Sequence, residues 1–280
     1  MISVIIPTYN RAFCIERAVQ SVLEQSTPPG EILIVDDGST DNTKAIITRL
    51  QNSSAIPVVY FHQPNQGAAS ARNKGIVKSH FDMVAFLDSD DWWHKNKLAI
   101  QYDAMQRKDA AMISHTREIW FRHGKRVNQK KKHDPPHGNI FVPSLRMCVV
   151  GMSTVMMHKS CFERFGYFDE QLPCCEDYDL WLRMSCAIPF QRIDEALTFK
   201  DGGHEDQLSA IHRMGMDTYR ITALVNVIQG GQLSDEQHLN AVAELHRKCT
   251  IYGNGCIKHG RAEEGRTYLQ LPERIKNQLH

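Results

Sequence analysis

Three carboxylates fall within four residues in Asp88-Ser89-Asp90-Asp91, a segment that we call the acidic quartet. Charges this close repel one another unless water or a cation offsets them. Mg²⁺ and Mn²⁺ favour oxygen ligands, and Mg²⁺ commonly takes one or two protein carboxylates together with substrate phosphates. An EF-hand is excluded, because Trp93 and Ala99 stand where its loop requires Gly and Glu. The quartet is either a solvated turn or a site for Mg²⁺ or Mn²⁺, and the apolar run that leads into it favours the metal.

Two other sets of charged residues suit a nucleotide. In Asp36-Asp37 a carboxylate can accept hydrogen bonds from a base or from ribose hydroxyls, although Asp is also favoured at helix N-termini. The guanidinium of Arg72 matches the oxygens of a diphosphate, although a surface helix position is an equally simple explanation.

A second acidic pair, Glu176-Asp177, lies far along the chain from the quartet. An acid at the start of a helix is commonly just a cap. Transfer of a group to a hydroxyl, however, needs a base that takes the hydroxyl proton. This pair is therefore a candidate source of a catalytic base.

The elements that must position these residues alternate along the first ninety residues. Short apolar runs indicate strands buried on both faces, and each is followed by a segment with helical spacing. Strand-helix-strand alternation at this spacing predicts a doubly wound, mostly parallel sheet flanked by helices. The expected strands are 3–6, 32–35, 58–61 and 83–87, and the expected helices begin near 15, 42 and 68.

Polar residues follow each of these four strands. In open parallel sheets ligands bind at the carboxyl ends of the strands, so these residues should meet at one edge. The four strand ends are Pro7-Thr8-Tyr9-Asn10, Asp36-Asp37, the segment from His62 to Arg72, and the quartet.

The second half is less regular. We expect helices over 95–107 and 177–186, a strand over 110–121, an exposed polar loop over 122–139, and helices from about residue 214 onward. We therefore predict one α/β domain over 1–213, with a nucleotide-binding half at 1–110 and an acceptor half at 111–213. Residues 214–280 would form a helical C-terminal extension that covers the acceptor site, forms a homodimer or binds a partner.

The composition is that of an ordinary soluble protein: 280 residues, 42% hydrophobic, 23% charged, with a net charge of +1. Nothing in this balance indicates nucleic acid as a partner. The cluster Lys130-Lys131-Lys132 is a solvated loop or a contact for an anionic acceptor or a lipid head group.

No signal peptide or membrane-spanning run is recognisable, so we expect a cytoplasmic protein, with peripheral contact at the inner face of the membrane as an alternative. The eight cysteines are then expected to be reduced.

Taken together, these segments resemble the family 2 glycosyltransferases, which have the GT-A fold. The resemblance covers residues 1–210, and its motifs say little about which sugar or acceptor is used. The matching segments are 3–10 (SVIIPTYN), 32–41 (ILIVDDGSTD), 65–73 (NQGAASARN), 86–93 (FLDSDDWW) and 176–183 (EDYDLWLR).

The resemblance implies a role for each matching residue, with uracil the commonest base in the family. Asp177 would be the catalytic base, beside Glu176 in the substrate site, and Asp90 would bind the metal. His204 lies where relatives have a loop that closes over the diphosphate, so it would contact metal or phosphate; Lys200-Asp201 departs from the usual pattern there. The other implied contacts are Pro7, Thr8 and Tyr9 with base and ribose, Asp37 with the base, Arg72 with the diphosphate, Asp88 with ribose or donor sugar, Asp91 with the donor sugar or the surroundings of the metal, and Trp181 with a sugar face or the core.

The predicted activity is inverting transfer of a sugar from a nucleoside-diphosphate sugar, in the first place a UDP-sugar, to a glycan, lipid-linked or protein acceptor. A sugar-1-phosphate nucleotidyltransferase would require a glycine-rich phosphate loop after the first strand, and residues 7–11 contain no glycine. A non-catalytic nucleotide-sugar-binding module would keep the first four strand ends without needing Glu176-Asp177.

Overall fold

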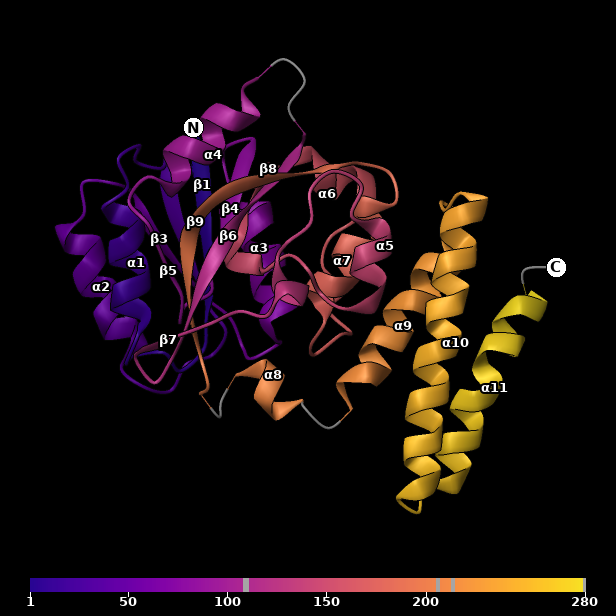
Figure 1. The fold of residues 1–280 in the computed structure, drawn as a ribbon. Coiled ribbons are helices and arrows are strands. Elements are labelled where there is room, and N and C mark those ends of the chain that lie inside the picture. The colour runs from indigo at the N-terminus through magenta and orange to yellow at the C-terminus, as the bar shows by residue number, and fades with distance from the viewer. Residues whose placement is uncertain (108–110, 205–206, 213–214, 279–280) are drawn as a thin grey trace.

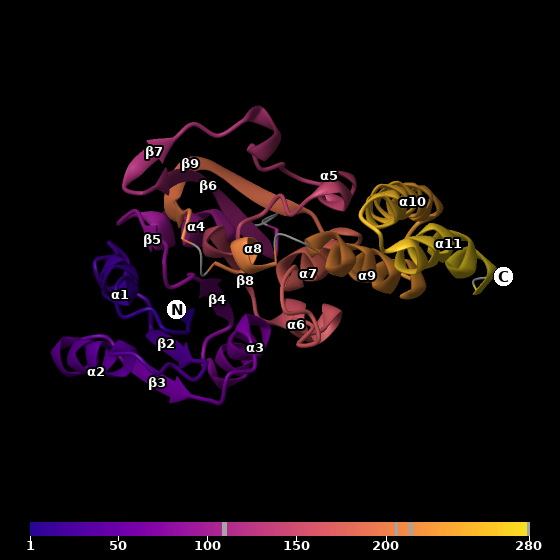
Figure 2. The ribbon, with the colours of Figure 1, turned by 90° about the horizontal axis from the view of Figure 1, so that it is seen from below.

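The structure is a computed structural model that describes residues 1–280 except 108–110, 205–206, 213–214 and 279–280. One curled, mixed sheet lies between helices on its two faces, and three long helices form an arm at one side (Figure 1). The view from below in Figure 2 shows the same two parts, with the arm extending away from the sheet.

The first ninety residues fold as the sequence predicts. The four strands β1–β4 are parallel and lie in the order β3-β2-β1-β4. Alternate residues of β1 enter two different cores, Ile5 on the face covered by α3, and Val4 and Ile6 on the face covered by α1 and α2. The elements are β1 (Ile2–Thr8), α1 (Ile15–Leu23), β2 (Glu31–Asp36), α2 (Thr43–Ser53), β3 (Val58–His62), α3 (Ala68–Lys78) and β4 (Met83–Phe86).

The second half completes the sheet with antiparallel and parallel strands. Strand β8 runs antiparallel between β4 and β6, whereas β9 runs parallel to β6 and antiparallel to β5. The expected helix at 95–107 and the expected strand at 110–121 are confirmed as α4 and β6. The elements are β5 (Trp92–Trp93), α4 (Lys97–Met105), β6 (Ile113–Arg122), β7 (Lys125–Val127), β8 (Val155–His158) and β9 (Phe190–Gly202), with short helices η1 (Lys131–His133), α5 (Phe141–Arg146), η2 (Met152–Thr154), α6 (Ser160–Phe165), α7 (Glu176–Ser185) and α8 (Leu208–Ile211).

The expected exposed polar loop over 122–139 contains a short strand and a short helix, which the sequence did not predict. Strand β7 pairs with the end of β6 through a tight turn at His123-Gly124, where both residues have positive φ angles of 51° and 71°. Such two-residue turns match the natural twist of a hairpin, and glycine at the second position favours them. The segment nevertheless remains largely exposed.

The arm consists of α9 (Met216–Gln229), α10 (Asp235–Lys258) and α11 (Ala262–Gln278). Ser234 and Gln237 form a capping box that starts α10. Helices α10 and α11 approach closely at Gly253 and Gly265, since a Cβ added to Gly253 would lie 2.7 Å from the Gly265 carbonyl oxygen. Among the described residues, no helix combines the length and apolar character that crossing a membrane requires.

A third core joins this arm to the sheet domain. Its members come from both sides of the predicted boundary at 213/214: Phe141, Leu145, Tyr178 and Leu182 on one side, and Ile221, Leu224, Val227, Leu245 and Cys249 on the other. The boundaries at 110/111 and 213/214 fall on residues outside the described ones, and the division into domains stays a prediction.

Candidate active site

The strand ends of β1 and β2 meet beside the start of α3. The Asp37 amide donates to the Thr8 carbonyl (2.9 Å), and the Asp37 carboxylate accepts from the Gln63 side chain (2.8 Å) and the amides of Gln66 (2.9 Å) and Gly67 (2.8 Å). Gly67 has a φ of +92°, which a residue with a side chain rarely adopts. Asp37 therefore fixes the loop from which α3 begins.

Helix α3 carries Arg72 from this group to the acidic quartet. Arg72 is 5% exposed; it donates to Asp88 Oδ1 (2.8 Å) and to Glu176 Oε1, and its Nε has no hydrogen-bond partner among the described residues. Burial alone would lower the pKa of Arg72, but the carboxylates of Asp88 and Glu176 raise it. A charged guanidinium thus bridges the quartet and the second acidic pair, which lie about 90 residues apart in sequence.

Asp91 holds three segments together. Its carboxylate accepts from Ser153 Oγ (2.6 Å) and from the amide of Asp201 (3.1 Å), and Ser153 also accepts from the Asp88 amide (3.0 Å). Burial, reinforced by Asp90, raises the pKa of Asp91 well above its usual range. The quartet is therefore anchored to η2 and to the end of β9.

Asp90 faces a different set of partners. Its Oδ2 accepts from the Gln207 side chain (2.8 Å), and burial together with Asp88 raises its pKa. Burial would lower the pKa of Lys200, but Glu118 and the three aspartates of the quartet raise it. A charged Lys200 therefore offsets part of the negative charge of the quartet.

The carboxylates of the quartet suit a metal ion that would take most of its ligands from substrate phosphates and water and few from the protein. No group of three or more His, Cys, Asp or Glu side chains suited to a metal ion occurs within the described part of the chain. Both oxygens of Asp91 are engaged, whereas Asp88 is paired with Arg72 through Oδ1 alone and Asp90 accepts from Gln207 through Oδ2 alone, so Asp90 and Asp88 each keep an oxygen that could bind an ion. Mg²⁺ is often bound in this way, by one or two carboxylates, water and substrate phosphates. His204 lies beside the ring of Phe13, with its Nε2 3.8 Å from Asp201 Oδ1.

The start of α7 presents the second acidic pair. Cys175, just before the helix, has a left-handed backbone with φ at +65°. Asp177 is half-buried; its Oδ1 accepts from the Tyr178 amide (2.7 Å) and its Oδ2 accepts from the thiol of Cys148 (3.2 Å). Burial raises the pKa of Glu176 even though Arg72 opposes this effect.

The structure brings together Arg72, the quartet, Glu176 and Asp177, and it links Thr8 and Asp37 to them through α3. It does not bring Trp181 to the surface of this site: the ring is 1% exposed, and its Nε1 donates to the Val150 carbonyl (3.0 Å). Pro7 is buried within β1, whereas Tyr9 is 45% exposed beyond its end.

Several supporting residues escaped the sequence-based prediction. Ser153, Cys148, Lys200 and Gln207 all contact or face the acidic residues, yet each lies in a segment that was not assigned to a buried strand or to a motif. The pair Lys200-Asp201 was noticed only as a departure from the family pattern. A polar residue that hydrogen-bonds to a site residue or offsets its charge cannot be recognised from sequence spacing, because the two residues lie far apart in the sequence.

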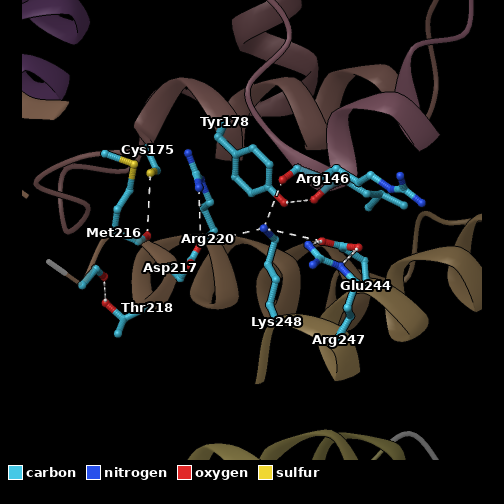
Figure 3. Close-up of polar contacts among 12 residues, drawn as sticks. Arg146, Cys175, Tyr178, Met216, Asp217, Thr218, Arg220, Glu244, Arg247 and Lys248 are labelled. Atoms are coloured by element: carbon cyan, nitrogen blue, oxygen red, sulfur yellow. Dashed lines mark hydrogen bonds and ion pairs between the residues drawn. The ribbon is translucent and has the colours of Figure 1, made fainter. Parts of the chain in front are cut away.

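The arm packs behind α7 (Figure 3). The Tyr178 hydroxyl donates to the Leu145 carbonyl (2.6 Å), and the buried Lys248 donates to the Arg146 carbonyl (3.1 Å) and lies 3.5 Å from Glu244. The thiol of Cys175 faces the Met216 carbonyl at 4.0 Å. Helices α9 and α10 thus support the helix that carries Glu176 and Asp177.

The sequence matches the family model "Glycosyl transferase family 2" over residues 3–170. The chain belongs to this family. A glycosyltransferase of Rickettsia felis is 36% identical over 203 residues, which is 70% of this chain but only 32% of that protein, so the chain spans about a third of the Rickettsia relative. TuaG of Bacillus subtilis, described as a putative teichuronic acid biosynthesis glycosyltransferase, is 38% identical over 57% of this chain and 62% of its own length. WfgD of Escherichia coli, named as a UDP-Glc:α-D-GlcNAc-diphosphoundecaprenol β-1,3-glucosyltransferase, is 30% identical over 65% of this chain and 68% of its own length.

Solved structures agree on the fold. Residues 1–349 of S. aureus TarS in complex with UDP-GlcNAc superpose with a TM-score of 0.74 at 19% identity, covering 98% of this chain and 82% of that one. The mannosyltransferase PcManGT of Pyrobaculum calidifontis, in complex with GDP-Man and Mn²⁺, gives a TM-score of 0.59 at 16% identity over 98% of this chain and 84% of its own. The predicted fold, a GT-A sheet with C-terminal helices, is confirmed.

Proposed function

We propose that this chain is an inverting glycosyltransferase that moves a sugar from a UDP-sugar to an acceptor hydroxyl in polysaccharide or glycan assembly. The observation that carries the proposal is the double ion pair of Arg72, which holds Glu176, and with it Asp177, beside the acidic quartet. The guanidinium of Arg72, the three carboxylates of the quartet and the half-buried carboxylate of Asp177 are thereby gathered in one region at the ends of the strands. This set of groups suits a diphosphate leaving group and a base on the attacking hydroxyl.

The donor would lie along the strand ends. Tyr9 is 45% exposed at this edge and would line the base and ribose site together with Thr8, whose buried Oγ1 has no hydrogen-bond partner among the described residues, and Asp37. Arg72 would approach the diphosphate, Asp88 would contact the ribose or donor sugar, and the buried Asp91 would support the donor sugar or the surroundings of the metal. UDP is the favoured carrier because WfgD is named for UDP-Glc and the TarS structure holds UDP-GlcNAc.

Asp177 would act as the base. The acceptor oxygen attacks the anomeric carbon, its proton passes to an Asp177 oxygen, and the bond from the anomeric carbon to the diphosphate breaks on the opposite face. A single displacement of this kind inverts the anomeric configuration. Glu176, held by Arg72, would keep the carboxylate of Asp177 directed toward the acceptor.

Mg²⁺ or Mn²⁺, when bound, would supply positive charge to the departing diphosphate. Asp90 would be its protein ligand, and His204 would contact the metal or a phosphate. The Gln207 side chain, which now donates to Asp90 Oδ2, would have to move for a second carboxylate oxygen to bind the ion.

Asp177→Asn tests the role of the base. We expect transfer to fall about 10²–10⁴-fold, the usual value of general-base help, while donor affinity stays the same. Release of nucleotide in the presence of acceptor measures transfer, and calorimetry measures donor binding. Asp235→Asn, which removes an exposed acid from the first turn of α10, is the matched control. Transfer by Asp177→Asn at the wild-type rate would exclude Asp177 as the base.

Asp90→Ala tests the metal. Donor binding by the wild type should weaken when a chelator replaces Mn²⁺, and the variant should bind donor equally weakly under both conditions. Calorimetric affinities of the wild type that are the same with and without chelator would contradict the metal role.

The choice of donor is tested by a panel of UDP-, GDP- and dTDP-sugars with Mn²⁺, read by thermal shift, because a ligand of the folded state raises the unfolding temperature. A UDP-sugar should give the largest shift. Donor binding without transfer or slow hydrolysis would instead indicate a non-catalytic binding module.

A further inference from the structure

The end of β6, strand β7 and the start of η1 form a strongly basic surface feature. We define residues 122–132 as the basic hairpin. All six of its cationic side chains are exposed, and no Asp or Glu occurs from 119 to 133. The six are Arg122, Lys125, Arg126, Lys130, Lys131 and Lys132.

None of these six side chains forms an ion pair with a residue that the structure describes. Nearby Arg117 and Arg192, in contrast, both pair with Asp134 and Asp194. The net charge of the chain is +1, so the remainder without the six cations carries +1 − 6 = −5. Positive charge is concentrated in this segment because six Lys and Arg residues and no Asp or Glu occur within 119–133.

The basic hairpin lies at the rim of the candidate active site. Strand β6 runs parallel to β9, with Phe121 opposite Asp201 and Arg122 opposite Gly202. The amide of Asp201 donates to Asp91 of the quartet. Figure 2 shows β7 at the outer margin of the sheet, on the side away from α2 and α3. A surface that binds the hairpin would therefore lie next to the edge where the strands end.

We propose that the basic hairpin binds an anionic phospholipid surface. Lysine is a compact point charge that needs no fixed partner geometry, so a protruding row of lysines and arginines suits a diffuse layer of head-group phosphates. Val127, 39% exposed between the two groups of cations, adds an apolar side chain that can enter the head-group region.

The same segment is poorly suited to nucleic acid. Single strands are usually bound by a positive groove together with aromatic rings on which bases stack. The basic hairpin contains no Phe, Trp or Tyr, and the two rings just before it already pack on other rings, Trp120 on His133 at 4.9 Å and Phe121 on Trp92 at 5.2 Å between ring centroids.

Vesicle sedimentation with the full chain tests this proposal without any transfer reaction, so it stands or fails independently of the proposed function. Phosphatidylcholine vesicles should bind little protein, and vesicles that also contain phosphatidylglycerol should bind it in a salt-sensitive way. Each basic side chain near such a surface is worth about fivefold in binding, so Lys130→Glu/Lys131→Glu/Lys132→Glu should weaken binding by at least about a hundredfold.

The matched control is Lys258→Glu/Arg266→Glu/Lys276→Glu, which changes three exposed cations on α10 and α11 and reaches the same net charge. It should bind anionic vesicles much more tightly than the hairpin variant, and both variants should unfold at the wild-type temperature, because their side chains are exposed. Equal wild-type binding to neutral and anionic vesicles would overturn the proposal. So would wild-type binding by the hairpin variant, an equal loss in both variants, or retention on single-stranded DNA but not on anionic vesicles.

Discussion

Individual carboxylates in the quartet differ in what they do, although they are adjacent in sequence. Asp88 is paired with Arg72, Asp90 accepts from Gln207, and Asp91 is buried at 1% exposure between Ser153 and Asp201. The sequence predicted which charged residues would gather at the strand ends, because Asp, Arg and Glu can be recognised by residue type alone. It did not predict this division, which depends on Ser153 and on residues of β9 more than 60 positions away.

Asp91 should make stability depend on pH. Because burial raises its pKa in the folded state above the unfolded value, ionisation costs the folded state more, and the free energy of unfolding should fall as pH rises through the folded pKa. Asp91→Asn removes the titrating group, so its free energy of unfolding should depend less on pH than that of the wild type, although the amide cannot replace both hydrogen bonds that the carboxylate accepts.

Urea denaturation between pH 4 and pH 8, without metal, measures this effect. Asp103→Asn, at an exposed position of α4, is the control and should follow the wild type. An Asp91→Asn variant whose free energy of unfolding falls with pH as steeply as that of the wild type would contradict the prediction.

Cys148 is a positioning residue for the proposed base. Burial, and then the Asp177 carboxylate, raise the pKa of Cys148 well above its usual range, so the sulfur carries its proton and donates to Asp177. Cys148→Ala removes a donor that stabilises the charged carboxylate. The acid limb of the pH–rate profile should therefore move to higher pH, and Cys148→Ser, a stronger donor, should return it to wild-type pH or below. An acid limb that stays in place in both variants would show that Cys148 does not act on the base.

At the scale of elements, the strands with the clearest sequence pattern are those buried on both faces. β1, β2 and β4 are continuous apolar runs for this reason. β9 is 13 residues long but mixes charged and apolar residues, and β5 is two residues long. Such strands exist through pairing with distant partners and leave no pattern of their own in the sequence. Lys200 and Asp201 were therefore not placed beside the quartet.

The start of α7 carries backbone strain at Cys175. A left-handed conformation costs a residue with a side chain about 1–2 kcal/mol, whereas glycine adopts it freely. Cys175→Gly should raise the free energy of unfolding by up to about 1 kcal/mol, since the added freedom of the unfolded chain offsets part of the gain.

Cys186→Gly is the matched control at the other end of α7, where φ is −67° and glycine brings no relief. It should lower the free energy of unfolding by about 0.5–1 kcal/mol in the same denaturant titration. A loss of stability in Cys175→Gly as large as in the control would show that the left-handed residue is not strained.

At the scale of the whole molecule, the arm and the sheet domain share one core. Leu224 on α9 is fully buried in that core together with Tyr178 and Leu182 of α7. Leu224→Ala should lower the free energy of unfolding by about 2–5 kcal/mol and should also reduce transfer, because α7 carries the proposed base.

Leu239→Ala, at a position of α10 that is 70% exposed, should change stability by less than about 0.5 kcal/mol. Circular dichroism and tryptophan fluorescence should report one coincident transition for the wild type, because the arm and the domain unfold together. Two separated transitions, with only the helical signal sensitive to Leu224→Ala, would contradict a shared core.

Because of this shared core, the parts of the chain must fold in a certain order during synthesis. Strands β1–β4 pair with one another within the first 86 residues and can do so early during synthesis, whereas the apolar face of α7 waits for α9 and α10. At about 5–20 residues per second, the 64 residues between the end of α7 and Cys249 take roughly 3–13 s to make. During that interval the nascent protein exposes Tyr178, Leu182 and Phe141, a surface on which chaperones can act before the acidic pair is fixed.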